Sequence, residues 1–80
     1  MAKFILHHRH RGNECEAAFT AWLGFESPLR KRVAPCTCLS DDHRIWWTVD
    51  AADAGQALAL LPKYVAARTE AIHVREVVIP

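Results

Sequence analysis

The amino-acid sequence predicts an α+β domain in which four strands and two helices follow one another in the order βαββαβ. Three observations support this: runs rich in β-branched and aromatic residues, stretches with helical periodicity, and glycine, proline or aspartate at the breaks between them. Eighty residues make one domain, so we expect a single unit over residues 1–80. The hydrophobic share of 51% is typical of a globular chain and not of a disordered one.

The first half of the chain begins with a predicted strand over residues 3–10, KFILHHRH, which is apolar at its start and polar at its end. Asn13 and Glu16 then have the spacing of a helix capping box. Residues on one face of the following helix recur at helical spacing, and they are Cys15, Ala18, Phe19 and Trp22. Gly24 is expected to end this helix.

The second half supplies the remaining elements. We expect a second strand near Val33, at an edge of the sheet, because Pro35 cannot donate to a central ladder. A tight turn over residues 40–43 leads into a third strand, RIWWTVD. Further elements are a helix capped by Asp53 and ended by Pro62, a short helical turn after Pro62, and a last strand over residues 71–79.

This order of elements is typical of the split βαβ, or ferredoxin-like, sandwich. Right-handed crossovers favour an antiparallel sheet of order 4-1-3-2 with both helices on one face. In that topology the first two strands end where the last two begin. All five histidines are therefore expected at one end of the sheet, and the LRKR stretch over residues 29–32 is expected in a solvated loop at the other end.

The histidine cluster is the candidate functional site. Imidazole and thiolate ligands together suit zinc, nickel or copper, so we expect a divalent metal, nickel or zinc, or a small ligand at this end. His7 and His73 are the leading pair because their strands are neighbours, and His8 and Cys38 are further candidates. No standard zinc spacing is present, and a polar strand end without any ligand is the alternative.

The sheet face opposite the helices is expected to be too apolar to leave in water. We therefore expect the chain to pair with itself, as a homodimer or a larger assembly, with this face forming the interface or a ligand pocket. Alternation along the strands predicts that this surface carries Ile5, Cys36, Trp46, Thr48, Arg75 and Val77.

Several classes of protein are disfavoured. A net charge of +1 argues against a dedicated nucleic-acid binder, and no apolar run is long enough for a membrane span. The opening MAKFIL is too short for a signal peptide, and three cysteines suggest reduced thiols, so we expect a cytoplasmic location. No nucleophile with a base and an orienting third group is identifiable, so no catalytic residue is assigned.

The chain also resembles a known group of proteins. The opening MAKF, the His7-His8 pair, the stretch over residues 39–58 and the ending HVREVVIP resemble small bacterial ferredoxin-like proteins that form dimeric α+β barrels. The similarity is greatest to short members of largely unknown function, some of which bind nickel. It implies divalent-metal binding through His7 and His8, and self-association. The wider group includes cofactor-free monooxygenases and isomerases, which makes such an enzyme the alternative function. A structural or interaction domain without a ligand is a further alternative.

Overall fold

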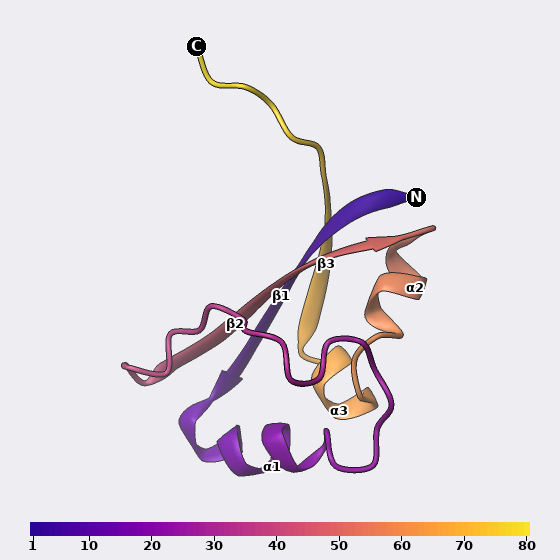
Figure 1. The fold of residues 1–80 in the computed structure, drawn as a ribbon. Helices are drawn as coiled ribbons and strands as arrows, with labels where there is room; N and C mark the ends of the chain where they lie inside the picture. Colours follow the sequence, from indigo (N-terminus) through magenta and orange to yellow (C-terminus); the bar gives the residue numbers. More distant parts are fainter.

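The protein folds around one three-stranded antiparallel sheet, as seen in the computed structural model, which describes residues 1–80 (Figure 1). The strands are β1 (Ala2–Arg11), β2 (Asp42–Ala51) and β3 (Thr69–Val74), in the order β2-β1-β3. β1 pairs with β2 along its whole length, and its first part pairs with β3 on the other side. The polar end of β1 therefore lies beside the beginning of β2.

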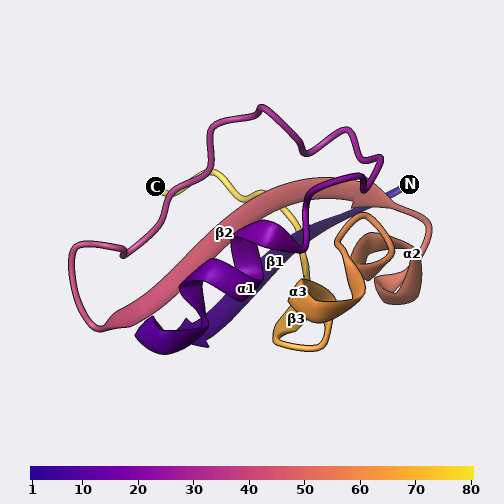
Figure 2. The same ribbon diagram turned by 90° about the horizontal axis from the view of Figure 1, so that it is seen from below.

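Short helical elements connect the strands, and the α-helices lie on one face of the sheet (Figure 2). They are the 3-10 helix η1 (Gly12–Glu14) and the α-helices α1 (Cys15–Thr20), α2 (Ala54–Leu58) and α3 (Lys63–Ala66). An irregular segment after α1 returns beside the outer edge of β2. None of the helices combines the length and the apolar character needed to cross a bilayer.

The core forms between this helical layer and alternate residues of the two long strands. On β1, Phe4 and Leu6 face the helices, and on β2, Ile45, Trp47 and Val49 do so. The same alternation continues past Leu6, so the side chains of His8 and His10 also point inward. The apolar core therefore passes directly into a buried layer of histidines at one end of the sheet.

The expected four-stranded sheet of order 4-1-3-2 is wrong, because the second strand does not form. The segment near Val33 makes only one isolated bridge, between Cys36 and Ile45. Pro35 accepts a hydrogen bond from the Trp46 N–H at 3.1 Å, but it has no N–H to extend the ladder. The three strands that do form are the first, third and fourth of the expected order.

The last strand also differs from the expectation. β3 begins at Thr69 and ends at Val74, and Val74 lies opposite Lys3 near the start of β1. The residues after Val74 have almost no β1 left to pair with. They extend away from the sheet with Val77, Val78 and Ile79 exposed (Figure 1).

The helices and helix caps predicted from the sequence are confirmed only in part. Asp53 caps α2 as predicted, because its side chain accepts a hydrogen bond from the Gln56 N–H at 2.8 Å. The short helix predicted after Pro62 is α3. Asn13, in contrast, is not a cap. It lies inside η1, and Glu14 takes the N-cap position of α1.

The sheet face away from the helices carries Ile5 on β1, Trp46 and Thr48 on β2, and Ile72 on β3. Ile72 is 41% exposed, and the α-helices all lie on the other face of the sheet. Arg75 and Val77 lie beyond the end of β3 and do not belong to it. Self-association through this face stays a prediction.

Candidate metal centre

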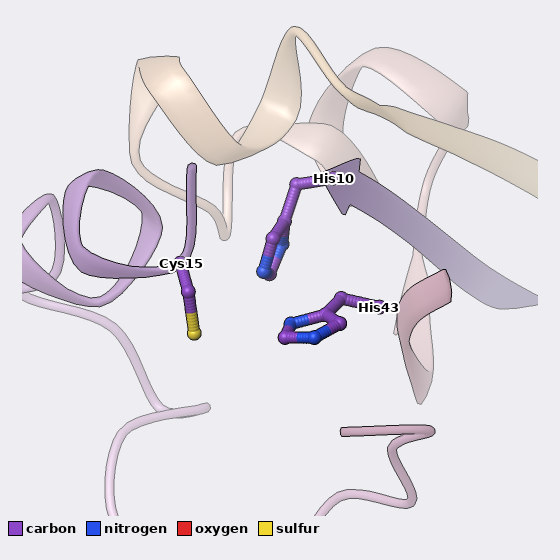
Figure 3. A group of neighbouring side chains, drawn as sticks. All are labelled: His10, Cys15 and His43. Carbon is purple, nitrogen blue, oxygen red and sulfur yellow. The ribbon is translucent and has the colours of Figure 1, made fainter. Parts of the chain in front are cut away.

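Three side chains from three elements converge at the histidine end of the sheet. His10 and His43 lie directly opposite each other on β1 and β2, and Cys15 is the first residue of α1. One ligand atom from each of the three lies within 4.8 Å of the others. Figure 3 shows the two imidazoles and the thiol turned toward a common space. The group could hold a metal ion.

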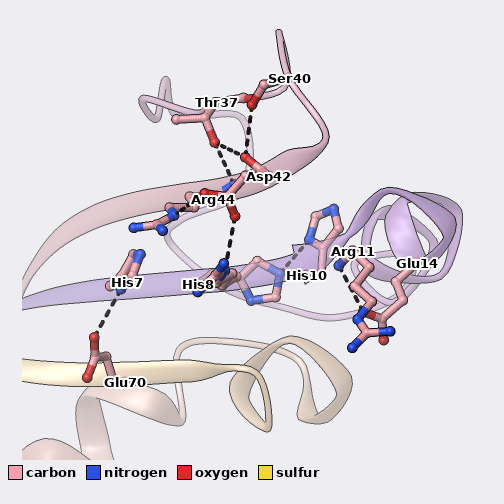
Figure 4. A network of polar contacts seen from close by, with 11 residues as sticks. His7, His8, His10, Arg11, Glu14, Thr37, Ser40, Asp42, Arg44 and Glu70 are labelled. Carbon is pink, nitrogen blue, oxygen red and sulfur yellow. Dashed lines mark hydrogen bonds and ion pairs between the residues drawn. The ribbon is translucent and has the colours of Figure 1, made fainter.

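The position of Cys15 depends on its neighbour Glu14, which joins the start of α1 to two other elements. One oxygen of the Glu14 carboxylate accepts the backbone N–H of Arg11 at 2.9 Å (Figure 4). The other accepts the Arg68 guanidinium at 3.0 Å and the Tyr64 hydroxyl at 3.3 Å. The pKa of Glu14 is lowered below its usual value, first by the hydrogen bond from the Arg11 backbone N–H and next by the hydrogen bond from the Arg68 side chain. Glu14 is thus held as an anion that fixes the entry into α1.

The position of His43 depends in the same way on its neighbour Asp42. The Asp42 carboxylate accepts the Arg9 side chain at 3.0 Å and the Arg44 side chain at 2.8 Å. Burial alone would raise the pKa of Asp42, but the two arginines outweigh it and the pKa is lowered. Thr37 adds a second restraint, because its hydroxyl donates to the Asp42 carbonyl (Figure 4). These contacts fix the backbone and side chain of Asp42, which directly precedes His43.

Two ring nitrogens of the group have no hydrogen-bond partner. His10 is only 4% exposed, and its buried Nε2 makes no hydrogen bond within the chain. The buried Nδ1 of His43 is in the same state. A buried polar atom without a partner costs on the order of 1–3 kcal/mol. Both nitrogens are therefore available to bind a metal ion or another group from outside the chain.

The hydrogen bonds behind His10 assign its proton. Thr69 Oγ1 donates to the Val65 carbonyl at 2.7 Å, so it accepts from His8 Nδ1 at 3.0 Å. His8 Nδ1 then carries the proton, and His8 Nε2 accepts from His10 Nδ1 at 2.8 Å. His10 Nε2 is left with a lone pair directed toward the group. A second partner that fixes the tautomer of a ligating histidine is the usual arrangement in metal sites.

Both buried histidines of this chain of hydrogen bonds favour their neutral form. Burial, and then the neighbouring His10, lowers the pKa of His8. Burial, and then the neighbouring His43, lowers the pKa of His10. Because a metal binds the neutral imidazole, both shifts favour the ligating state near neutral pH.

The group is not fully enclosed, because Cys15 and His43 are only half-buried. A polar hollow adjoins His10, and it is lined by Arg9, His10, Arg11, Glu14, Asp41 and Asp42. Three protein ligands with solvent access differ from a closed structural zinc site, which uses four protein ligands. The arrangement leaves a coordination position for water or for a bound molecule.

The structure does not bring the sequence-predicted ligands together as one set. His7 lies on the opposite face of β1, stacked on Trp46 with ring centroids 5.4 Å apart and bonded to Glu70 at 3.0 Å. His8 lies behind His10 and holds it. His73 lies opposite Phe4, whereas Glu70 lies opposite His7, so His73 is three residues, or about 10 Å, away from His7 along the strands. Cys38 is an exposed residue of the turn before β2.

Sequence reasoning missed the grouping of His10, Cys15 and His43. Alternation along β1 puts His8 and His10 on the same face of the strand as Leu6, and that was the usable signal for His10. Cys15 belongs to the apolar stripe of its helix, a pattern that predicts a small core residue and not a ligand. The entry angle set by Glu14 decides its position, and no local pattern reveals that angle.

Comparison with known proteins adds no assignment, since no family model, curated protein or solved structure matches the chain. The resemblance to ferredoxin-like dimeric barrels stays a prediction.

Proposed function

We propose that this chain is a metal-binding protein that holds one divalent transition metal ion, zinc or nickel, through His10, Cys15 and His43. The observation that carries the proposal is the convergence of one thiol and two buried, unpartnered imidazole nitrogens within 4.8 Å. Each imidazole has a buried ring nitrogen that makes no hydrogen bond within the protein.

The donor set limits the choice of metal. Two nitrogens and one sulfur suit zinc, nickel or copper, whereas calcium and magnesium prefer oxygen ligands. Zinc is compatible with tetrahedral coordination by such a set, with water from the adjoining hollow as the fourth ligand. Nickel with a further ligand is the second form of the same proposal.

Cys38 is the protein group that could replace this water. The pKa of Cys38 is raised by its hydrogen bond with the Cys36 thiol, by burial, and by the charges of Cys36 and Cys15. Cys38 lies outside the close group of His10, Cys15 and His43. The turn before β2 would have to move to bring it in.

The proposal can be tested with cobalt, zinc and nickel on untagged protein. Cobalt(II) gives a sulfur-to-metal charge-transfer band only if a thiolate is bound, so wild type should show this band at one ion per chain. Cys15→Ser should abolish the band if water is the fourth ligand, and should weaken it if Cys38 also binds. Cys38→Ser should retain it if water is the fourth ligand, and should weaken it if Cys38 takes part.

Zinc and nickel affinities should be measured by competition with a chromophoric chelator. His10→Gln and His43→Gln should each weaken binding by about a hundredfold or more, since losses of even outer partners cost 10- to 100-fold. His73→Gln is the matched control and should bind as wild type does. Absence of metal binding in wild type, or an unchanged band in Cys15→Ser, would overturn the proposal.

A further inference from the structure

A second concave site lies between α1, the segment that follows it, and β2. The groove has a volume of about 360 Å³. Its walls are formed by Phe19 and Trp22 on one side and by Ile45 and Trp47 on the other. Phe19 is 53% exposed, which is unusual for a phenylalanine that has an apolar surface beside it. The groove thus offers an aromatic surface that the chain leaves partly in water.

Three consecutive cations line the same groove: Arg30, Lys31 and Arg32. None of them takes part in any ion pair of the protein. Arg30 donates only to the carbonyl of Phe25, at 3.4 Å. No acidic residue lines the groove. The positive charge beside this apolar surface is therefore not neutralised within the chain.

The cations are held by a firmly anchored turn. Leu29 is 4% exposed and packs in the core. Ser27 accepts the Leu29 N–H at 3.1 Å and donates to the Leu60 carbonyl at 2.7 Å. Lys31 adopts a left-handed backbone with φ of 65°, which costs energy in any residue except glycine. Such conformations persist where the surrounding structure imposes them, and they cluster at binding sites.

We propose that this groove binds a small aromatic carboxylate. The ring would lie against Phe19 and Trp22, and the carboxylate would be bound by Arg30 and Arg32, whose guanidinium groups match its two oxygens. The volume lies at the small end of ligand pockets, which suits a molecule of one or two rings. Positive charge and aromatic walls together select this class over neutral aromatic compounds and over small inorganic anions.

The groove is independent of the proposed metal centre. None of His10, Cys15 and His43 lines it. The two sites are nevertheless neighbours, because Cys15 and Phe19 lie one helical turn apart and His43 and Ile45 lie on the same face of β2. Failure of either proposal leaves the other standing, since ligand binding in the groove needs no metal.

The three tryptophans provide a test within the protein itself. Trp22 and Trp47 line the groove, whereas Trp46 points to the other face of the sheet. Titration with 2-naphthoate should shift the indole N–H signals of Trp22 and Trp47 in a nitrogen-proton NMR spectrum and leave that of Trp46 in place. Calorimetry should show binding of 2-naphthoate and at least about tenfold weaker binding of the uncharged 2-naphthylmethanol.

Variants at exposed positions distinguish binding in the groove from general electrostatic attraction between the anion and the positive charges of the protein. Arg30→Gln with Arg32→Gln should weaken 2-naphthoate binding about tenfold or more. The matched control is Lys63→Gln with Arg75→Gln, which removes the same charge away from the groove and should bind as wild type does. The proposal is overturned if wild type gives no binding, if the alcohol binds equally well, if both double variants lose affinity alike, or if only Trp46 shifts.

Discussion

Replacing His8 with leucine tests the role of the histidine behind the metal group. His8 is fully buried, and its Nε2 is the acceptor for His10 Nδ1 at 2.8 Å. Leucine has a similar volume but offers no acceptor. In the variant, nothing favours the proton on Nδ1 of His10, and a metal must compete with a proton for Nε2. We therefore expect weaker metal binding although no ligand is removed.

The size of the effect follows from the hydrogen bonds. Loss of a partner that orients a ligating histidine costs about 10- to 100-fold in affinity. That corresponds to about 1.4–2.8 kcal/mol. Thr69→Val should have a smaller effect, because the Val65 carbonyl remains 3.2 Å from His8 Nδ1 and can still accept its proton. The three proteins should thus rank as wild type, Thr69→Val and His8→Leu in decreasing affinity for zinc.

Competition for zinc against a chromophoric chelator at pH 7.5 gives these affinities. His7→Leu is the matched control, because His7 is the neighbouring residue on β1 but points to the opposite face. It should bind zinc as wild type does. Wild-type affinity in His8→Leu, or an equal loss in His7→Leu, would refute the role assigned to the hydrogen bond between His8 and His10.

Three further predictions concern stability and assembly. Asp53→Ala removes the cap of α2 and should lower the free energy of unfolding in urea by about 1 kcal/mol, whereas Glu26→Ala at an exposed position should not. Burial lowers the pKa of both His8 and His10, so below about pH 6.5 the unfolded chain binds more protons than the folded one. Metal-free protein should therefore unfold more easily at pH 5.5 than at pH 7.5, and a flat profile would contradict this. The chain should self-associate through the face that carries Ile5, Trp46 and Ile72, and Trp46→Glu should sediment as a monomer. A monomeric wild type would exclude that interface.

The two long strands could be predicted because each is decided by its own residues. RIWWTVD is rich in β-branched and aromatic side chains, and KFILHHRH alternates between a buried and an open face. The cap at Asp53 is equally local. The segment around Val33 could not be predicted in this way, because an edge strand forms only if enough hydrogen bonds connect it to the neighbouring strand. With Pro35 in the segment, pairing stops at a single bridge.

The candidate site could be predicted only in its location and its chemistry. The sequence indicated the correct end of the sheet and the correct residue types, histidine and cysteine. The set of ligands depends on strand register, and the register of β3 places His73 opposite Phe4, six residues from His10 along β1. It also depends on the ion pair between Glu14 and Arg68, which are 54 residues apart in the chain. Interactions of that range leave no local pattern.

The position of the proposed metal also bears on how so small a domain is stabilised. On β1 the apolar core ends at Leu6, and the inward-facing residues beyond it are His8 and His10. α1 contributes only Ala18 as a fully buried residue, so apolar packing alone holds it weakly to the sheet. A metal bound by Cys15 at the start of α1 and by His10 and His43 on the sheet would connect these elements directly. At a free concentration one hundred times the dissociation constant, it would add about 2.7 kcal/mol to the stability of the fold. Because only 14 of the 80 residues are buried, this free energy is large compared with the apolar packing that holds α1 against the sheet.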